Sequence, residues 1–316
     1  MYILEVKNLK VYFSQKGKVL KAVDGISFFI REGESLGLAG ESGSGKTVTA
    51  LSLTRLVSHP YLLSGEVLFR GKNIFRLKSA DLRKIRGAEI AYIFQNPLSS
   101  LNPVFTVGNQ MIEIIRLHHR KTKREAEVYA LKMLEKVGIP DAYKNLRSYP
   151  HQLSGGMNQR VMIAMALSCH PSLLIADEPT TNLDATTQVQ ILQLIERIKK
   201  EERLSLLFIT HDLEILRRFT NRVAIMYAGQ IVEIGENLFE KPFHPYTYAL
   251  LSARSGIIPE QGLKGEAPSP FAFPAGCRFH PRCPFKRSIC EEKEPILQEK
   301  KKGHFVACHF PQTMVK

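Results

Sequence analysis

The stretch GESGSGKT, at residues 40–47, matches the pattern G-x-x-x-x-G-K-[S/T] of a phosphate-binding loop. Glycines in such a loop let backbone N–H groups turn inward around an anion, and the helix that follows adds its positive end. Lys46 is expected to reach the β- and γ-phosphates of a nucleotide, and Thr47 to offer its hydroxyl to Mg²⁺. A chance glycine-rich turn is the alternative. The predicted nucleotide-binding residues are Gly40, Ser42, Gly43, Ser44, Gly45, Lys46, Thr47 and the residue at position 48.

Two carboxylates follow an apolar segment in LLIADEP, at residues 173–179. Asp177 is expected to lie beside the metal ion that accompanies a nucleotide. We expect the strand to extend through Glu178, so that its side chain points away from that of Asp177, toward a water that attacks the γ-phosphate. A solvated pair at a strand end is the alternative, which the preceding apolar run disfavours.

A histidine, His211, ends the next apolar segment, LLFITHD. A lone histidine is commonly a hydrogen-bonded structural residue. Here it ends a neighbouring strand at the sheet edge where open α/β sheets bind ligands, which favours a catalytic role.

The elements that must position these residues are predicted from hydrophobic periodicity. Residues 3–13 and 19–30 alternate as a strand pair, and 47–57 continue from the phosphate-binding loop as a helix. A helical region from 104 to 170 contains Ala130, Met133, Leu134 and Val137 at i, i+3, i+4, i+7 spacing, before Gly138 and Pro140 stop the helix. From residue 172 strands and helices alternate, which predicts an α/β fold with a mainly parallel sheet. The segment QIVEIG is expected to add an antiparallel edge strand.

Composition limits the remaining choices. The chain has 316 residues and a net charge of +14, and its first residues alternate like a strand instead of resembling a secretion signal. No apolar run reaches the ~18–20 residues that span a bilayer. The densest basic stretch, RLHHRKTKRE, lacks interleaved aromatic residues, so we interpret the charge as solvated and expect no nucleic-acid partner. Proximity to a membrane surface is the second interpretation.

Three further motifs complete a resemblance to a known family. LSGGMNQR (153–160) resembles the signature motif of ATP-binding-cassette (ABC) ATPases, FQNPLSSLNP their Q-loop with Gln95, and TTNLDATT their D-loop with Asp184. The signature departs from the commonest pattern at Met157, where glutamine is more usual. Six motifs in family order identify the chain as resembling ABC ATPases.

The resemblance implies a P-loop ABC ATPase core, with a mainly parallel sheet and flanking helices, an antiparallel β subdomain and a helical subdomain at about 96–170. It also implies ATP and Mg²⁺ as cofactors, and a head-to-tail dimer in which Ser154 and Gly156 close over the partner's nucleotide. Gln95 is expected to sense Mg²⁺ or the attacking water. The resemblance further implies that an aromatic residue stacks on adenine, and this residue is Phe13 or, alternatively, Tyr12.

The last part of the chain narrows the resemblance to one subfamily. FHPYTYALLSA (243–253), followed by a cysteine-bearing extension, resembles the ATPase subunits of dipeptide and oligopeptide importers, which also include nickel and glutathione importers. This implies a nucleotide-binding domain at 1–235 and an extension at 236–316. It further implies a second ATPase subunit, two permeases, an extracytoplasmic binding protein, and a place on the cytoplasmic face of the membrane. A nucleic-acid-linked ABC ATPase and a non-catalytic cassette remain alternatives.

Four of the five cysteines lie near the end of the chain, with the spacing C-x5-C-x6-C-x17-C. Close C-x2-4-C pairs typical of zinc sites are missing, although His280, His304 or His309 could replace a thiol. Wide, irregular gaps favour a [4Fe–4S] cluster, with zinc as the alternative and an inert reduced set as the third. A cluster would hold together a loop-rich, metal-binding extension. The expected ligands are Cys277, Cys283, Cys290 and Cys308.

Overall fold

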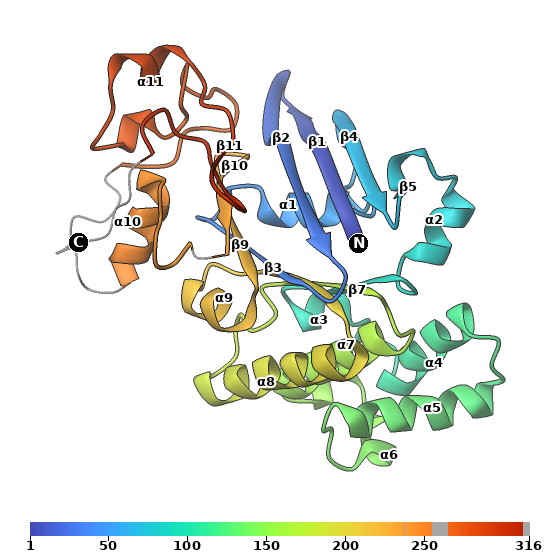
Figure 1. Ribbon diagram of the computed structural model, residues 1–316. Helices are drawn as coiled ribbons and strands as arrows, with labels where there is room; N and C mark the ends of the chain where they lie inside the picture. The colour runs from blue at the N-terminus through green and yellow to red at the C-terminus, as the bar shows by residue number, and fades with distance from the viewer. Residues whose placement is uncertain (237, 255–264, 312–316) are drawn as a thin grey trace. The chain divides into compact units, whose positions relative to one another are not determined.

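The computed structural model describes the chain except for residues 237, 255–264 and 312–316 (Figure 1). Two compact units share the chain. Among the described residues, no helix combines the length and the apolar character needed to cross a membrane. Unit 1 consists of Met1, Arg31–Gly33 and Arg76–Leu207, and unit 2 of Tyr2–Ile30, Glu34–Phe75 and Phe208–Lys316.

Unit 1 is mainly helical. Its elements are α2 (Ser79–Ile85), β6 (Ile90–Ile93), α3 (Pro97–Ser100), α4 (Val107–His118), α5 (Lys123–Lys136), α6 (Ala142–Asn145), η2 (Pro150–Gln152), α7 (Gly155–Leu167), β7 (Leu173–Asp177), α8 (Ala185–Glu202) and β8 (Ser205–Ile209), whose last two residues belong to unit 2.

Helix α5 shows why these segments are helical. Thr122 caps its start by accepting a hydrogen bond from the backbone N–H of Glu125, whose side chain bonds back to the Thr122 N–H. Its buried residues Ala126, Ala130, Met133 and Leu134 form one apolar stripe, and α5 packs on α4 and α7. Gly138, with φ of +77°, ends the helix as the sequence predicts.

The parallel strands β6 and β7 bring two motifs of unit 1 to one edge. Their register pairs Ile90 with Leu173 and Ile93 with Ala176. All five residues of β7 are buried, which explains the continuous apolar run before Asp177. Because parallel strands share their carboxyl edge, the residues after β6 and after β7 emerge side by side.

Unit 2 contains the long strands. Its elements are β1 (Tyr2–Gln15), β2 (Lys18–Arg31), β3 (Ser35–Ala39), α1 (Lys46–Ser52), β4 (Leu62–Phe69), β5 (Lys72–Asn73), η1 (Ile74–Arg76), α9 (Leu213–Phe219), β9 (Arg222–Tyr227), β10 (Gln230–Gly235), α10 (Pro245–Arg254), η3 (His280–Arg282), α11 (Ser288–Glu292), β11 (Gln298–Lys301) and β12 (His304–Val306). The last residue of β2 and that of η1 belong to unit 1.

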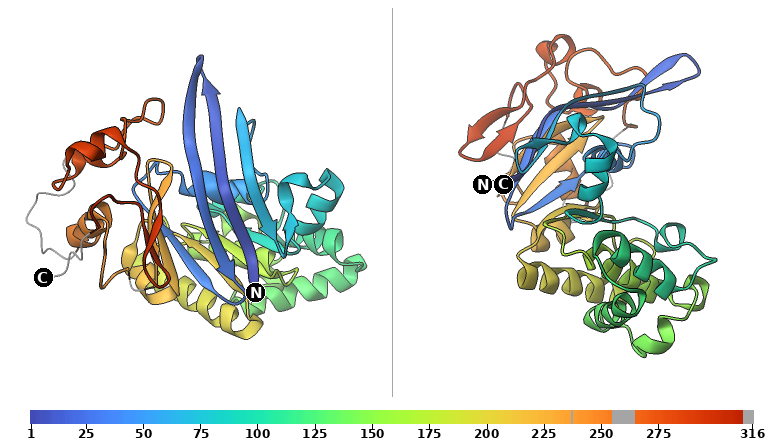
Figure 2. Two further views of the ribbon diagram at one scale, coloured as in Figure 1. Left: turned by 45° about the horizontal axis from the view of Figure 1, so that its top comes forward. Right: turned by 90° about the vertical axis from the view of Figure 1, so that its right-hand side faces the viewer.

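Two sheets contribute to unit 2. One has the order β2-β1-β4-β5, and Figure 2 shows its long strands β1 and β2 side by side. In the other, β3 pairs with β9 in parallel, and β9, β10, β12 and β11 follow as antiparallel neighbours. The antiparallel β10 is therefore confirmed, but it is not an edge strand, because β12 from the end of the chain covers its open side.

The helix after the phosphate-binding loop is shorter than predicted. Instead of extending to residue 57, α1 ends at Ser52. Arg55 adopts a left-handed conformation with φ of +56°, and the backbone N–H of Leu56 donates to the carbonyl of Leu51 at 2.8 Å. This arrangement closes the last turn of the helix, which apolar periodicity alone does not reveal.

Candidate functional site

The phosphate-binding loop (residues 40–47) connects β3 to α1 in unit 2. The ammonium group of Lys46 donates to the carbonyl oxygens of Gly40 at 2.8 Å and Glu41 at 2.9 Å, and lies 3.4 Å from the hydroxyl of Ser44. Lys46 is only 7% exposed, whereas Thr47 is exposed at the start of α1. The loop therefore curls around a positive charge held on neutral oxygen atoms.

Two glycines show why this loop tolerates few side chains. Gly45 has φ of +104°, and a Cβ atom there would lie 2.3 Å from the backbone oxygen of Ala22. Gly43 also has positive φ, at +76°, but a Cβ atom there would meet nothing within 4 Å. The loop is thus packed against backbone at Gly45 and has open space at Gly43. A buried ammonium group beside an open glycine turn fits a polyphosphate chain.

In unit 1, Glu178 does not continue strand β7. Its φ is +46°, so the chain turns directly after Asp177, and the predicted extended strand end is wrong. One carboxylate oxygen of Glu178 accepts hydrogen bonds from Gln95 Nε2 at 3.0 Å and from Thr181 Oγ1 at 2.9 Å. The structure therefore joins two residues predicted from separate motifs, and adds Thr181, which sequence reasoning missed although it lies three residues beyond Glu178.

The signature turn (residues 153–160) leads into α7. Ser154 is exposed and caps the helix, its hydroxyl accepting from the backbone N–H of Met157 at 3.3 Å. The buried side chain of Asn158 donates to the carbonyl oxygens of Pro150 at 2.9 Å and Leu153 at 3.3 Å. These bonds hold the turn from within, so that Ser154 and Gly155 face solvent in this chain.

Asp184 of the predicted D-loop has a structural role in this chain. It caps α8 by accepting from the backbone N–H of Thr187 at 3.0 Å and from its hydroxyl at 2.6 Å. These bonds hold the pKa of the Asp184 carboxyl below its usual value. The methyl group of Thr187 also approaches the signature turn, because a Cβ atom at Gly156 would lie 2.6 Å from it.

His211 lies exposed in the bend between β8 and α9. The preceding residue, Thr210, donates its backbone N–H to the carbonyl of Leu38 at 3.3 Å, one residue before the end of β3. Within unit 2 the histidine therefore follows directly on a residue paired with the strand that enters the phosphate-binding loop. Asp212 caps α9 and fixes the bend on its other side.

Comparison with known proteins decides the family. The ABC transporter family matches residues 23–181. The chain belongs to that family. Residues 232–290 of this ABC protein also match the oligopeptide/dipeptide transporter C-terminal region.

Several full-length relatives are similar to it. The dipeptide transport ATP-binding protein DppD of Haemophilus influenzae is 46% identical, covering 98% of this chain and 96% of that protein. The DppD protein of Escherichia coli is 43% identical, with 98% and 97% covered. The oligopeptide transport ATP-binding protein AppD of Bacillus subtilis is 45% identical, with 97% and 96% covered.

Two solved structures share the fold. A dimeric post-hydrolysis state of the ATP-binding cassette MJ0796, bound to ADP and Pi, has a TM-score of 0.67 and 28% identity, covering 74% of this chain and 98% of that one. Another dimeric structure of MJ0796, a bacterial ABC transporter cassette, has a TM-score of 0.65 and 29% identity, with 72% and 96% covered. The mixed sheets and helices of this ABC protein are therefore a P-loop ABC ATPase fold.

The two aromatic residues considered for adenine differ in this ABC ATPase. The hydroxyl of Tyr12 bonds to Asp24, which Arg278 also contacts, and the ammonium group of Lys21 lies 5.7 Å from the Tyr12 ring centre. Burial and the bond to Asp24 raise the pKa of Tyr12. Burial alone would raise the pKa of Asp24, but hydrogen bonds from Tyr12 and Arg278 outweigh it and lower that pKa. Tyr12 is thus already engaged, whereas Phe13, its neighbour on β1, points to the opposite face of the strand.

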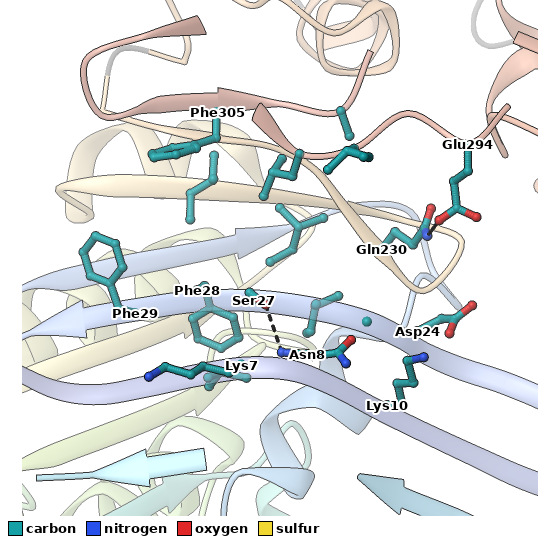
Figure 3. Close-up of a pocket in the computed structure, with 18 of the residues that line it drawn as sticks. Lys7, Asn8, Lys10, Asp24, Ser27, Phe28, Phe29, Gln230, Glu294 and Phe305 are labelled. Atoms are coloured by element: carbon teal, nitrogen blue, oxygen red, sulfur yellow. Dashed lines mark hydrogen bonds between the residues drawn. The ribbon is translucent and has the colours of Figure 1, made fainter. Parts of the chain in front are cut away.

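Tyr12 also lines a cavity of about 860 Å³ in unit 2 that includes no residue of the phosphate-binding loop. Figure 3 shows polar side chains at one end of it and aromatic side chains at the other. Lys10, Asp24, Gln230 and Glu294 lie at the one end, and Phe28, Phe29 and Phe305 lie at the other, with Lys7 beside them. Gln230 bonds to Glu294, which lies between Cys290 and Cys308, so β10 and the cysteine-bearing part of the chain meet at this wall.

The four cysteines of the cysteine segment (residues 276–308) gather in one neighbourhood. Burial raises the pKa of Cys308 to about 11, and the charges of Cys277, Cys283 and Cys290 add to the rise. Burial likewise raises the pKa of Cys277 to about 11. In the part of the chain that the structure describes, no three His, Cys, Asp or Glu side chains converge closely enough to hold a single metal ion. A metal-binding extension is therefore not shown.

The histidines considered as replacements for a thiol are each bonded to an oxygen atom. His304 lies 2.7 Å from a carboxylate oxygen of Glu233, and His309 Nε2 lies 2.7 Å from the backbone oxygen of Lys293. His280 Nδ1 lies 3.0 Å from the carbonyl oxygen of Cys277. These contacts occupy one ring nitrogen of each histidine and leave the other ring nitrogen as the candidate zinc ligand.

Proposed function

We propose that this chain is the ATP-binding and ATP-hydrolysing subunit of an ABC importer for dipeptides or oligopeptides. The names of its full-length relatives and the match of residues 232–290 to the oligopeptide/dipeptide transporter C-terminal region support this substrate class. A nickel or glutathione importer is the alternative within the same class of ATPase. The phosphate-binding loop, with its buried Lys46 and open glycine turn, is the observation that carries the proposal.

In this proposal the loop residues bind the phosphates of ATP. The Lys46 ammonium group exchanges its carbonyl partners for phosphate oxygens, which carry full negative charge and are stronger acceptors. Thr47 and Asp177 hold Mg²⁺, which neutralises charge on the phosphates when bound. Gly40, Ser42, Gly43, Ser44 and Gly45 contribute loop atoms, and Phe13 stacks on adenine because Tyr12 is bonded to Asp24.

Glu178 is proposed as the general base for hydrolysis. Its carboxylate accepts two hydrogen bonds, from Gln95 and Thr181, which hold the side chain in one orientation. Gln95 thereby links the base to the Q-loop, and we propose that this loop couples the nucleotide site to the permeases. His211 is proposed to stabilise charge on the γ-phosphate in the transition state.

The proposed assembly is a head-to-tail dimer with a second ATPase subunit, either another copy or a paralogue. The exposed Ser154 and Gly155 at the start of α7, together with Gly156, are available to a partner's nucleotide, and both structures of the similar cassette MJ0796 are dimeric. The dimer is proposed to sit at the cytoplasmic face of the membrane beneath two permeases, which receive peptide from an extracytoplasmic binding protein. Residues 1–235 form the nucleotide-binding domain, with 96–170 as its helical part, and residues 236–316 the extension.

The test is ATP hydrolysis by the complex assembled with its permeases. Replacing Glu178→Gln removes the base and is expected to slow hydrolysis by about 10²–10⁴-fold, while ATP still binds. Lys46→Ala is expected to abolish binding as well. Glu201→Gln, at an exposed position of α8, is the matched control and leaves both unchanged. Hydrolysis by the Glu178 variant at the wild-type rate would contradict the assignment.

We further propose that Cys277, Cys283, Cys290 and Cys308 hold a [4Fe–4S] cluster with a structural role. A cubane takes four thiolates set apart at its corners, and the charge effects of Cys277, Cys283 and Cys290 on Cys308 support the proposal that the four thiols are neighbours. Because the raised pKa values keep Cys277 and Cys308 protonated at neutral pH, metal binding must release protons.

Anaerobic purification followed by visible spectroscopy and analysis of iron, sulfide and zinc tests the cluster. Brown protein with about four irons and four sulfides per chain is the expected result. Colourless protein with one zinc per chain would replace the cluster by a zinc site. Metal-free protein that still hydrolyses ATP with its permeases would contradict both metals and leave the ATPase proposal intact.

A further inference from the structure

The cysteine segment contacts the phosphate-binding loop through one arginine. Arg282, the last residue of η3, donates from its two terminal nitrogens to the two carboxylate oxygens of Glu41, at 2.9 and 3.0 Å. Glu41 is the second residue of the loop. The Arg282 side chain is 6% exposed and that of Glu41 28%, so this paired bond is largely shielded from water.

Buried aromatic rings fix the arginine in place. Arg282 also donates to the hydroxyl of Tyr227 at 3.3 Å, and the Tyr227 ring packs at 4.5 Å from Tyr246 and 5.3 Å from Phe279, between ring centres. All three rings are at most 2% exposed. Partial burial alone would lower the pKa of Arg282, but its bonds to Glu41 and Tyr227 outweigh this and raise it.

Glu41 connects Arg282 to Lys46, the residue proposed to bind phosphate. Its backbone N–H donates to the hydroxyl of Tyr246 at 2.9 Å, and its carbonyl accepts the Lys46 ammonium group at 2.9 Å. The backbone on both sides of the Glu41 side chain is thus held, one end by the aromatic cluster and the other by Lys46. A shift of Glu41 therefore displaces an acceptor of Lys46.

The charge of Glu41 poses a second problem that Arg282 solves. A carboxylate within a loop that binds a polyphosphate repels the ligand, and repulsion is strong where water is partly excluded. The guanidinium group of Arg282 neutralises this carboxylate in a fixed geometry, since it stays charged at every accessible pH.

We propose that Arg282 is a positioning residue for ATP binding, which neutralises and holds Glu41 so that the cysteine segment sets the nucleotide affinity of the phosphate-binding loop. Arg282 directly precedes Cys283, and the turn that carries it begins with a bond from His280 N–H to the Cys277 carbonyl at 2.9 Å. Disorder of this turn withdraws the arginine from Glu41. The inference rests on the proposed ATP site and assigns that site a control element from the end of the chain.

A double-mutant cycle on the full chain tests this role, with Mg²⁺–ATP affinity measured by titration calorimetry. Arg282→Gln is expected to weaken binding at least about tenfold, because the unpaired Glu41 carboxylate repels phosphate. In a Glu41→Gln background the same replacement is expected to change the affinity less than threefold. Arg282→Lys, which keeps the charge without the paired geometry, is expected to lie between wild type and Arg282→Gln.

Arg287→Gln is the matched control. Arg287 lies in the same segment and stacks over Phe310, with its guanidinium carbon 4.1 Å from the ring centre, and is expected to keep wild-type affinity. Thermal melting of each variant shows whether it folds. If Arg282→Gln does not fold, Arg282→Lys is measured in the wild-type and Glu41→Gln backgrounds, and this second cycle gives the coupling between positions 282 and 41.

Failure of the inference and failure of the proposed function give different results in these experiments. If wild-type protein does not bind ATP, the proposed function is overturned and the inference with it. If wild type binds ATP and folded Arg282→Gln binds equally tightly, only the inference is overturned. Equal losses for Arg282→Gln in both backgrounds would reduce Arg282 to a purely structural residue and would also overturn it.

Discussion

Two glycine-bearing turns precede helices in this ABC ATPase, and they are held in place by different means. The phosphate-binding loop depends on residues far along the chain, since Tyr246 and Arg282 hold Glu41 from more than 200 positions away. The signature turn is held from within eight positions, by Ser154 and Asn158. A turn held by neighbouring residues keeps its conformation when its helix moves. The conformation of a loop held by distant residues changes when those residues move.

The largest effect is expected from Gly45→Ala in the phosphate-binding loop. The added Cβ atom would lie 2.3 Å from the Ala22 backbone oxygen at a left-handed φ, and backbone cannot move aside as a side chain can. Strain of about 3 kcal/mol should weaken ATP binding about 100-fold in calorimetry. Gly33→Ala is the control, because it has positive φ with nothing within 4 Å. Binding by Gly45→Ala within threefold of wild type would contradict the rigid-loop interpretation.

A pH-dependent loss of stability is expected next, on the side of the phosphate-binding loop. His244 is buried and accepts the backbone N–H of Tyr246 at 3.0 Å, and burial lowers its pKa from 6.5 to about 4. Between pH 6.5 and pH 4, His244 binds a proton in the unfolded chain but stays neutral in the folded chain. Folding therefore loses stability as the pH falls from 6.5 toward 4, by about 3 kcal/mol in total.

Denaturant unfolding at pH 7.5 and pH 4.5 measures this loss. His244→Gln cannot take up the proton and should lose about 2–3 kcal/mol less than wild type between the two values. Equal losses in both proteins would assign the effect to other groups.

A smaller and purely local effect is expected from Asn158→Ala in the signature turn. This change leaves the carbonyls of Pro150 and Leu153 without their buried donor, which should lower the free energy of unfolding by about 1–3 kcal/mol. Hydrogen exchange should rise at residues 150–157 while ATP affinity of the single chain stays constant. Asn145→Ala, which removes a solvent-exposed bond to Pro140, is the control with the smaller loss. A large change in ATP affinity would show that the two turns are coupled.

The smallest effect is expected from Gly156→Ala, because here the clash is with a side chain. The added Cβ atom would meet the methyl group of Thr187 at 2.6 Å, which should cost about 1 kcal/mol in thermal or denaturant unfolding. Adding Thr187→Ser removes that methyl group, keeps the hydroxyl bonded to Asp184, and should restore the stability. Failure of this rescue would place the strain in the backbone and remove the contrast with Gly45.

Sequence patterns predicted most of the motif placement, and the errors have identifiable causes. The buried strand before Asp177 and the amphipathic α5 follow from periodicity, which depends only on local burial. The predicted length of α1 and the predicted conformation of Glu178 were wrong. Arg55 and Glu178 adopt left-handed conformations without being glycines, so the sequence does not mark these turns. The nucleotide-site roles and the cysteine cluster stay predictions until the experiments above are done.

The amino-acid sequence by itself determined the family, the order of the motifs and the alternation of strands and helices, since each depends on neighbours within a few residues. Only the tertiary structure decided that Gln95 and Thr181 share one oxygen of Glu178, that β12 covers β10, and that Arg282 neutralises Glu41. These contacts join positions up to 241 residues apart. Such pairings arise from how the strands and helices pack, and a single sequence contains no local signal for them.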